Sequence, residues 1–175
     1  MSETPEARLA ALGLELPSVP APLAAYVPAV RTGQHVYTAG QLPMVDGKLL
    51  MTGKVGAQVS TAEAAALART ATLNALAAIA SVTGDLSAVV RVVKVTGFVA
   101  SDPAFTSQPQ VVNGASELLL EVFGEAGRHA RSAVGTAVLP FDAPVEIELI
   151  VEVSASPDPA APRSASPDPA APPND

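Results

Sequence analysis

The sequence predicts an α/β (α+β) fold, because two long helical patterns alternate with segments rich in β-branched residues. Residues 60–82 and 109–123 carry apolar side chains at three- and four-residue steps, which is typical of helices with one packed face. Residues 89–100, VVRVVKVTGFVA, are β-branched and long enough for a central strand. A strand, a crossover helix and a second strand form the minimal βαβ arrangement, so we expect helices packed onto a sheet.

The composition is that of one domain with an aliphatic core. Hydrophobic residues make up 49% of the 175-residue chain and aromatic residues only 3%, so Val, Leu, Ile and Ala must fill the interior. The net charge is −7 and the ten basic residues are scattered, which argues against nucleic acid as the main partner. The N-terminus lacks a secretory pattern, and Arg69 and Asn74 interrupt the most apolar helix. We therefore expect a cytoplasmic protein with no membrane partner.

Several enzyme classes are excluded by missing residues and motifs. The chain has no cysteine, which removes disulfides, thiolate catalysis and Cys-based metal sites. The only imidazoles, His35 and His129, do not have metal-ligand spacing, so no metal site is predicted. The chain contains no phosphate-binding loop, dinucleotide-binding glycine pattern or nucleophile elbow. No cofactor is therefore indicated.

The two ends of the chain are predicted to differ from its middle. Thr4 followed by Pro5 at the first helical position, and Gly13 as a stop, indicate a short helix over residues 5–12, which a proline-rich arm follows. We assign this helix and arm to residues 1–21. At the other end, SASPDPAAPR and SASPDPAAPP are near-duplicates with dense proline and no large apolar residue. Residues 154–175 are therefore predicted to be a disordered acidic tail.

The last predicted strand, residues 145–153, separates apolar from acidic side chains. Alternation places Glu146, Glu148 and Glu152 on one face, and it places five apolar residues on the other, namely Val145, Ile147, Leu149, Val151 and Val153. The acidic face is then held away from the core that the apolar face builds.

A guanidinium is expected close to this acidic face. Residues 129–153 are predicted to form two strands joined by a proline-bearing turn, so that the second strand folds back beside the first. Such a hairpin would bring Arg131 close to Glu146. A guanidinium beside a carboxylate is either a surface ion pair or a small-anion site with a built-in base.

Each candidate residue also has a structural explanation. Arg131 could be an ordinary surface arginine, and Glu146 could belong to a solvated strand face. Tyr26 could anchor the proline-rich arm through its ring. Asn113, a poor helix former within the second helix, could bond across the helix or simply be exposed. Residue type alone leaves these alternatives open.

Four motifs, in this order and spacing, resemble the reactive intermediate deaminase family, RidA or YjgF, over about residues 22–153. They are YVPAV (26–30), HVYTAGQLP (35–43), ARSAVGTAVLP (130–140) and VEIELIVEV (145–153). The resemblance implies a chorismate-mutase-like fold, with a mixed β-sheet and two main helices packed on one face. It also implies a homotrimer with three clefts between subunits.

The resemblance further implies a cofactor-free hydrolytic deaminase. In active members, the arginine matching Arg131 binds the carboxylate of a 2-imino acid. The glutamate matching Glu146 positions or activates the water that attacks the imine carbon, which releases ammonia and a 2-keto acid. The residues matching Tyr26, Gly40 and Asn113 line the same cleft. An imine is already electrophilic, so its hydrolysis needs positioning and one proton-handling group rather than a metal.

Two departures indicate a side branch of this family. Ala133 stands where many deaminases carry cysteine, and Ala39 replaces the usual serine before Gly40. The main alternative is a non-catalytic module that senses a small carboxylate metabolite in the same cleft. A ribonuclease activity, attributed to some relatives, fits poorly with a net charge of −7 and no basic stripe.

Overall fold

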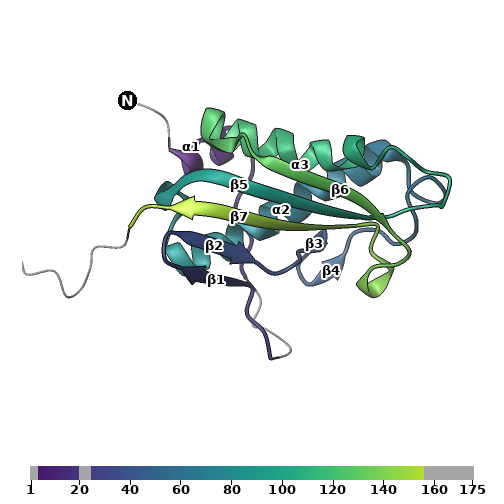
Figure 1. Ribbon diagram of the computed structural model, residues 1–175, viewed down its shortest axis with the longest axis horizontal. Helices are drawn as coiled ribbons and strands as arrows, with labels where there is room; N and C mark the ends of the chain where they lie inside the picture. The colour runs from purple at the N-terminus through teal and green to yellow at the C-terminus, as the bar shows by residue number, and fades with distance from the viewer. Residues whose placement is uncertain (1–3, 20–24, 156–175) are drawn as a thin grey trace, which may run out of the picture.

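The computed structural model describes residues 4–19 and 25–155, and its centre is a five-stranded mixed sheet in the order β1-β2-β7-β5-β6 (Figure 1). The strands are β1 (Ala29–Thr32), β2 (His35–Thr38), β5 (Val89–Ala100), β6 (Ala130–Thr136) and β7 (Val145–Val153). β5 pairs in parallel with β6 and antiparallel with β7. The mixed sheet expected from the sequence is confirmed.

Both main helices lie on the same face of this sheet (Figure 1). They are α2 (Thr61–Thr83) and α3 (Gln108–Phe123), close to the predicted ranges. The Ser60 hydroxyl accepts a hydrogen bond from the backbone of Glu63, and the Glu63 carboxylate accepts one from the backbone N–H of Ser60. This capping box fixes the start of α2. The α/β (α+β) class with two helices on one face is therefore confirmed.

The core lies between the sheet and the two helices. On β7, the apolar residues at alternate positions are at most 1% exposed, while Glu146, Glu148 and Glu152 are half-buried on the other face. Residues 89–100 form the long central strand β5, as predicted, and Val92, Val95 and Val99 are fully buried. The predicted separation of the acidic face from the core is confirmed.

The predicted hairpin of β6 with β7 is wrong, because β5 lies between them. β6 pairs in parallel with β5 after the α3 crossover, and β7 then pairs with the other edge of β5. The physical reason is burial. β7 contributes five fully buried apolar residues and needs a central place, whereas β6 buries none of its seven residues fully and suits an edge.

The smaller elements frame the sheet. β3 (Met44–Val45) and β4 (Lys48–Leu49) form a hairpin whose turn residues Asp46 and Gly47 both have positive φ, as the Asp-Gly pair predicted. Short 3-10 helices follow α2 (Leu86–Ala88), α3 (Gly124–Gly127) and β6 (Pro140–Asp142). The N-terminal helix α1 (Pro5–Ala11) packs on α3 through Leu9, which is 2% exposed. All but the first two residues of the predicted disordered tail lie outside the described residues.

α2 is the most apolar helix of the described part of the chain. Its length, and a mean hydropathy of 1.4 over its most apolar 18 residues, would suffice to cross a membrane. Half of this apolar stretch is buried within the fold, where α2 packs against β7 and α3. The hydropathy of α2 is therefore explained by its place as the central core helix.

Gly114 sets the distance between the two helices, which gives a test of the packing. A Cβ at this position would overlap the carbonyl oxygen of Ala65, a backbone atom of α2. We expect Gly114→Ala to destabilise the protein by about 1–3 kcal/mol, although alanine favours helices, because α2 and α3 must separate. Chemical denaturation measures this change. Glu117→Ala, at an exposed position of α3, is the control, and equal stability of the two variants would contradict the packing argument.

Candidate functional site

Arg131 lies on the helix-covered side of the sheet, at its β6 edge. Its backbone is opposite that of Val95, which points into the core, and residues opposite each other share a face. One guanidinium nitrogen, Nη1, donates to Asn113 Oδ1 at 2.8 Å and to Ser116 Oγ at 3.1 Å. Asn113 and Ser116 are one turn apart on the edge of α3 that faces β6. The structure thus brings together two of the residues that the sequence singled out, Arg131 and Asn113.

The rest of the Arg131 guanidinium is free to bind an anion. Among the described residues, neither Nε nor Nη2 of Arg131 has a hydrogen-bond partner, and Arg131 is in no salt bridge. The side chain is half-buried and lines an open cavity of about 230 Å³. Two adjacent N–H groups of an arginine match the two oxygens of a carboxylate.

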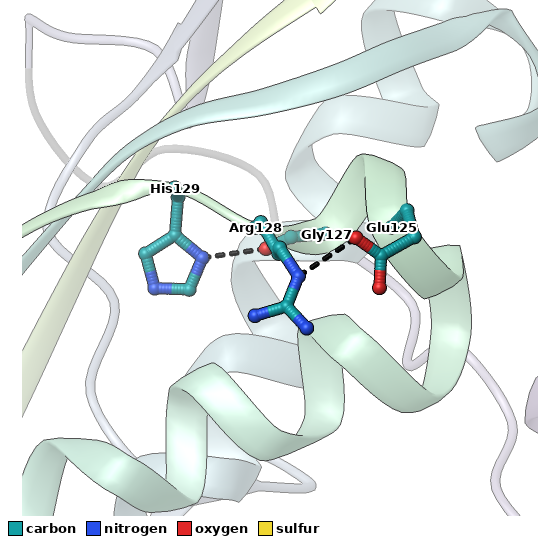
Figure 2. A network of polar contacts seen from close by, with 4 residues as sticks. All are labelled: Glu125, Gly127, Arg128 and His129. Atoms are coloured by element: carbon teal, nitrogen blue, oxygen red, sulfur yellow. Dashed lines mark hydrogen bonds and ion pairs between the residues drawn. The ribbon is translucent and has the colours of Figure 1, made fainter.

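His129 connects the same cavity to the protein backbone. Its Nδ1 lies 2.6 Å from the carbonyl oxygen of Gly127 (Figure 2), and its Nε2 lies 3.0 Å from Ser116 Oγ. Burial lowers the pKa of His129 below its ordinary value; the Gly127 carbonyl acts in the opposite direction, and the Arg131 charge adds to the lowering. The neutral form of the His129 ring is therefore favoured.

Arg128 lies at the rim of the cavity and is paired with an acid. Its Nε donates to Glu125 Oε2 at 2.8 Å (Figure 2). Both side chains are largely exposed, so the pair adds little stability. It does reduce the positive field at the rim, which leaves Arg131 as the cation that the cavity presents without a paired acid.

Glu146 lies on the opposite side of the sheet, on the face that the helices leave open. Its backbone pairs with that of Phe98, next to the buried Ile147. A Cβ at Gly40 would overlap the Glu146 carboxylate, so a side chain at position 40 would displace this carboxylate from its present position. Burial raises the pKa of Glu146, and the charge of Glu148 raises it further. A carboxylate with raised proton affinity is suited to accept a proton from water.

Tyr26 belongs to the same end of the sheet as Gly40 and Glu146. It lies just before β1, and Pro28 accepts a hydrogen bond from the N–H of Ala39 at 2.8 Å. The Tyr26 side chain is 60% exposed. The predicted site residues therefore form two groups, with Tyr26, Gly40 and Glu146 in one and Arg131 and Asn113 in the other.

The two groups do not meet within one chain. Arg131 and Glu146 are on strands two places apart in the sheet, and their partners on β5, Val95 and Phe98, are three residues apart. That corresponds to roughly 10 Å across the sheet and roughly 10 Å along it. Their side chains also point to opposite faces. The expectation that a hairpin places Arg131 beside Glu146 is wrong for the single chain.

Sequence reasoning missed Ser116 and His129 as members of the Arg131 site. His129 was considered only as a metal ligand, and within residues 4–19 and 25–155 no three His, Asp or Glu side chains gather to hold a metal ion. The available signal was spacing, since Ser116 follows Asn113 by one turn and His129 precedes Arg131 by two strand positions. It becomes informative only once α3 is known to lie beside β6.

The chain is similar in sequence to known proteins. A family model described as "YjgF/chorismate mutase-like, putative endoribonuclease" matches residues 6–153. Protein TCP17 of Trypanosoma cruzi is 47% identical over 149 residues, which cover 85% of this chain and 93% of TCP17.

Solved structures agree with this match. Protein Atu1372 of Agrobacterium tumefaciens, described as of unknown function, is 48% identical with a TM-score of 0.79, over 86% of this chain and 92% of that one. RidA of the Antarctic bacterium Psychrobacter sp. is 28% identical with a TM-score of 0.53, over 78% and 94% of the two chains. The fold, the motifs and these likenesses together show that the chain belongs to the YjgF/RidA family.

Proposed function

We propose that this protein is a cofactor-free imine deaminase, which hydrolyses 2-imino acids, or their 2-enamine forms, to 2-keto acids and ammonia in the cytoplasm. One observation carries the proposal: Arg131 is held through Nη1 alone, and its Nε and Nη2 are free in a small cavity. That arrangement fixes a guanidinium fork in a position to bind one carboxylate. Asn113 and Ser116 are its positioning partners.

The proposed reaction site forms between copies of the chain in a homotrimer. The open face of the sheet carries a row from Val30 through Tyr37 and Ile150 to Lys94, in register across four strands. Val30 is 53% exposed and Tyr37 is 40% exposed, so a second copy that covered this face would bury apolar surface. Such packing would also let Glu146 of one copy approach Arg131 of the next, which the single chain does not allow.

The proposed chemistry needs few groups. Arg131 binds the carboxylate of the imino acid through two N–H donors, which fixes the imine carbon. Glu146 takes a proton from the attacking water as the new C–O bond forms and gives it to the imine nitrogen, which yields a carbinolamine. Glu146 then takes the hydroxyl proton of the carbinolamine and gives it to the nitrogen as the C=O bond forms and the C–N bond breaks. Ammonia and a 2-keto acid leave, and Glu146 is again a carboxylate. The raised pKa of Glu146 favours these proton transfers near neutral pH.

The charge of the chain supports this proposal over a ribonuclease. The net charge is −7, and β7 adds three glutamates to the open face of the sheet. A protein that binds RNA through its phosphates needs a basic surface. A small, singly charged carboxylate needs only one free guanidinium.

Loss of the guanidinium should weaken the binding of substrate. We expect Arg131→Ala to reduce kcat/KM for freshly generated 2-imino acids by roughly 10- to 150-fold, since a charge-assisted hydrogen bond contributes about 1.5–3 kcal/mol. Ammonia release measures the rate. Arg69→Ala, on the outer side of α2 and paired with Glu121, is the matched control. Equal rates for wild type and Arg131→Ala would reject the proposal, and tight keto-acid binding without turnover would indicate a sensor instead.

Mixed trimers can test whether the site is shared. Arg131→Ala and Glu146→Gln subunits, each of reduced activity alone, should regain activity when they are unfolded and refolded together at equal amounts. In a cyclic trimer, about a quarter of the clefts then join an intact Arg131 to an intact Glu146 of the next copy. A site within one chain would recover nothing, and a monomer in sedimentation would also contradict the proposal.

The raised pKa of Glu146 predicts a pH-dependent effect on stability. The folded protein holds this proton more tightly than the unfolded chain, so Glu146 stabilises least once pH has risen above its folded-state pKa. Glu146→Gln should therefore gain stability relative to wild type as pH rises from 4 to 7. Thermal unfolding at both pH values measures this. Glu117→Gln, at an exposed position, should show no such trend, and a parallel trend in both variants would contradict the assignment to Glu146.

A further inference from the structure

We propose that Ser116, His129 and the carbonyl group of Gly127 form a second reactive centre beside Arg131, in which Ser116 is an acyl-accepting nucleophile and His129 is its base. Ser116 Oγ lies 3.0 Å from His129 Nε2, and His129 Nδ1 lies 2.6 Å from the Gly127 oxygen. A nucleophile within hydrogen-bond reach of a base, with the base oriented by a third group, is the arrangement of an activated serine.

The donor and the acceptor of each hydrogen bond between Gly127, His129, Ser116 and Arg131 can be assigned. A carbonyl oxygen only accepts, so Nδ1 of His129 carries the hydrogen that Gly127 binds (Figure 2). In the neutral ring, Nε2 is then an acceptor, and the Ser116 hydroxyl donates to it. Arg131 Nη1 donates to the oxygen of the same hydroxyl, Ser116 Oγ, at 3.1 Å. The Ser116 proton is therefore aimed at a base while a cation lies on its oxygen, and both favour alkoxide character.

Ser116 is in an unusual position for a helical serine. Four hydroxyls of α2 donate to backbone carbonyls of their own helix, namely those of Thr70, Thr72, Ser81 and Thr83. The Ser116 hydroxyl instead bonds the side chains of Arg131, on β6, and of His129, just before it. It is half-buried and lines the same cavity of about 230 Å³ as His129 and Arg131, so a small substrate can reach it.

The reaction that this arrangement supports is the hydrolysis of small activated esters. Ser116 Oγ attacks the ester carbonyl carbon while its proton moves to His129 Nε2, and the oxyanion faces the free N–H groups of Arg131. The bond to the alcohol breaks as Nε2 returns the proton to it, which leaves an acyl-serine. Water, deprotonated by His129, then attacks the acyl carbon, and the serine takes the proton back as the acid leaves.

The surroundings of His129 limit the substrates to esters with good leaving groups. The charged groups around the ring are Arg131 on β6 and Arg128, which is paired with Glu125, while α3 presents the neutral Ser116. No carboxylate of the described residues bonds the ring, so the imidazolium that forms is stabilised only by a carbonyl. An aryl alcohol is the leaving group that needs the least help from the imidazolium, so aryl esters are the substrate class that we assign.

The test uses 4-nitrophenyl acetate and a fluorophosphonate with the full-length protein. We expect nitrophenol release and a single fluorophosphonate adduct, mapped by mass spectrometry to Ser116. Ser116→Ala should lose the adduct and, like His129→Gln, reduce the rate by about 10²- to 10⁴-fold. The rate should fall in acid only below the ordinary histidine range, because the pKa of His129 is lowered. Ser81→Ala, whose hydroxyl bonds the Ala78 carbonyl, is the matched control and should react like wild type.

The outcomes separate this proposal from the deaminase. Glu146→Gln should lose imine hydrolysis and keep ester hydrolysis, because the proposed acyl transfer moves its protons through Ser116 and His129 and not through Glu146. Absence of an adduct at Ser116, or equal ester rates in wild type and Ser116→Ala, would overturn the serine centre whatever the result for imines. Circular dichroism of Ser116→Ala and His129→Gln verifies that a lost rate is not a lost fold.

Discussion

The pairing of β5 with a strand on each side is the constraint on which the rest of the structure depends. β5 takes β6 in parallel on one edge and β7 antiparallel on the other, so the two chemically distinctive strands cannot touch. Registers and face alternation then follow from the backbone. They place Arg131 under α3 and Glu146 on the open face, and no side-chain rotation within one chain joins them.

This constraint gives each group its own surroundings. Arg131 is braced by α3 through a single nitrogen, which costs the guanidinium little of its capacity to donate. Glu146 lies against the backbone at Gly40 and beside Glu148, so burial and like charge raise its pKa. Placing the two beside each other in one chain would form an ion pair, which would lower the pKa of the carboxyl and occupy the guanidinium. Within one chain, the separation leaves the guanidinium donors free and the pKa of the carboxyl raised.

The sequence predicts those features of the fold that depend on local periodicity. Alternation on β7 sorts its valines from its glutamates, and the capping box at Ser60 marks the start of α2, because each depends on residues a few positions apart. The strand order could not be read in the same way. A proline-bearing turn between β6 and β7 is compatible with a hairpin, and only the competition for central places in the sheet decides against it. The strand pattern and the family resemblance both indicate Arg131 and Glu146, but neither gives the face to which Arg131 points.

Ser116 and His129 illustrate why part of a site is hidden from sequence reasoning. Neither residue belongs to a recognisable motif, and thirteen positions separate them. They meet because α3 lies along β6, and the carbonyl that orients the ring comes from the turn between these two elements. Both proposed reactions depend on the free donors of Arg131. A carboxylate bound there would occupy the position of the ester oxyanion, so the two chemistries exclude each other at one guanidinium although their bases lie on opposite faces of the sheet.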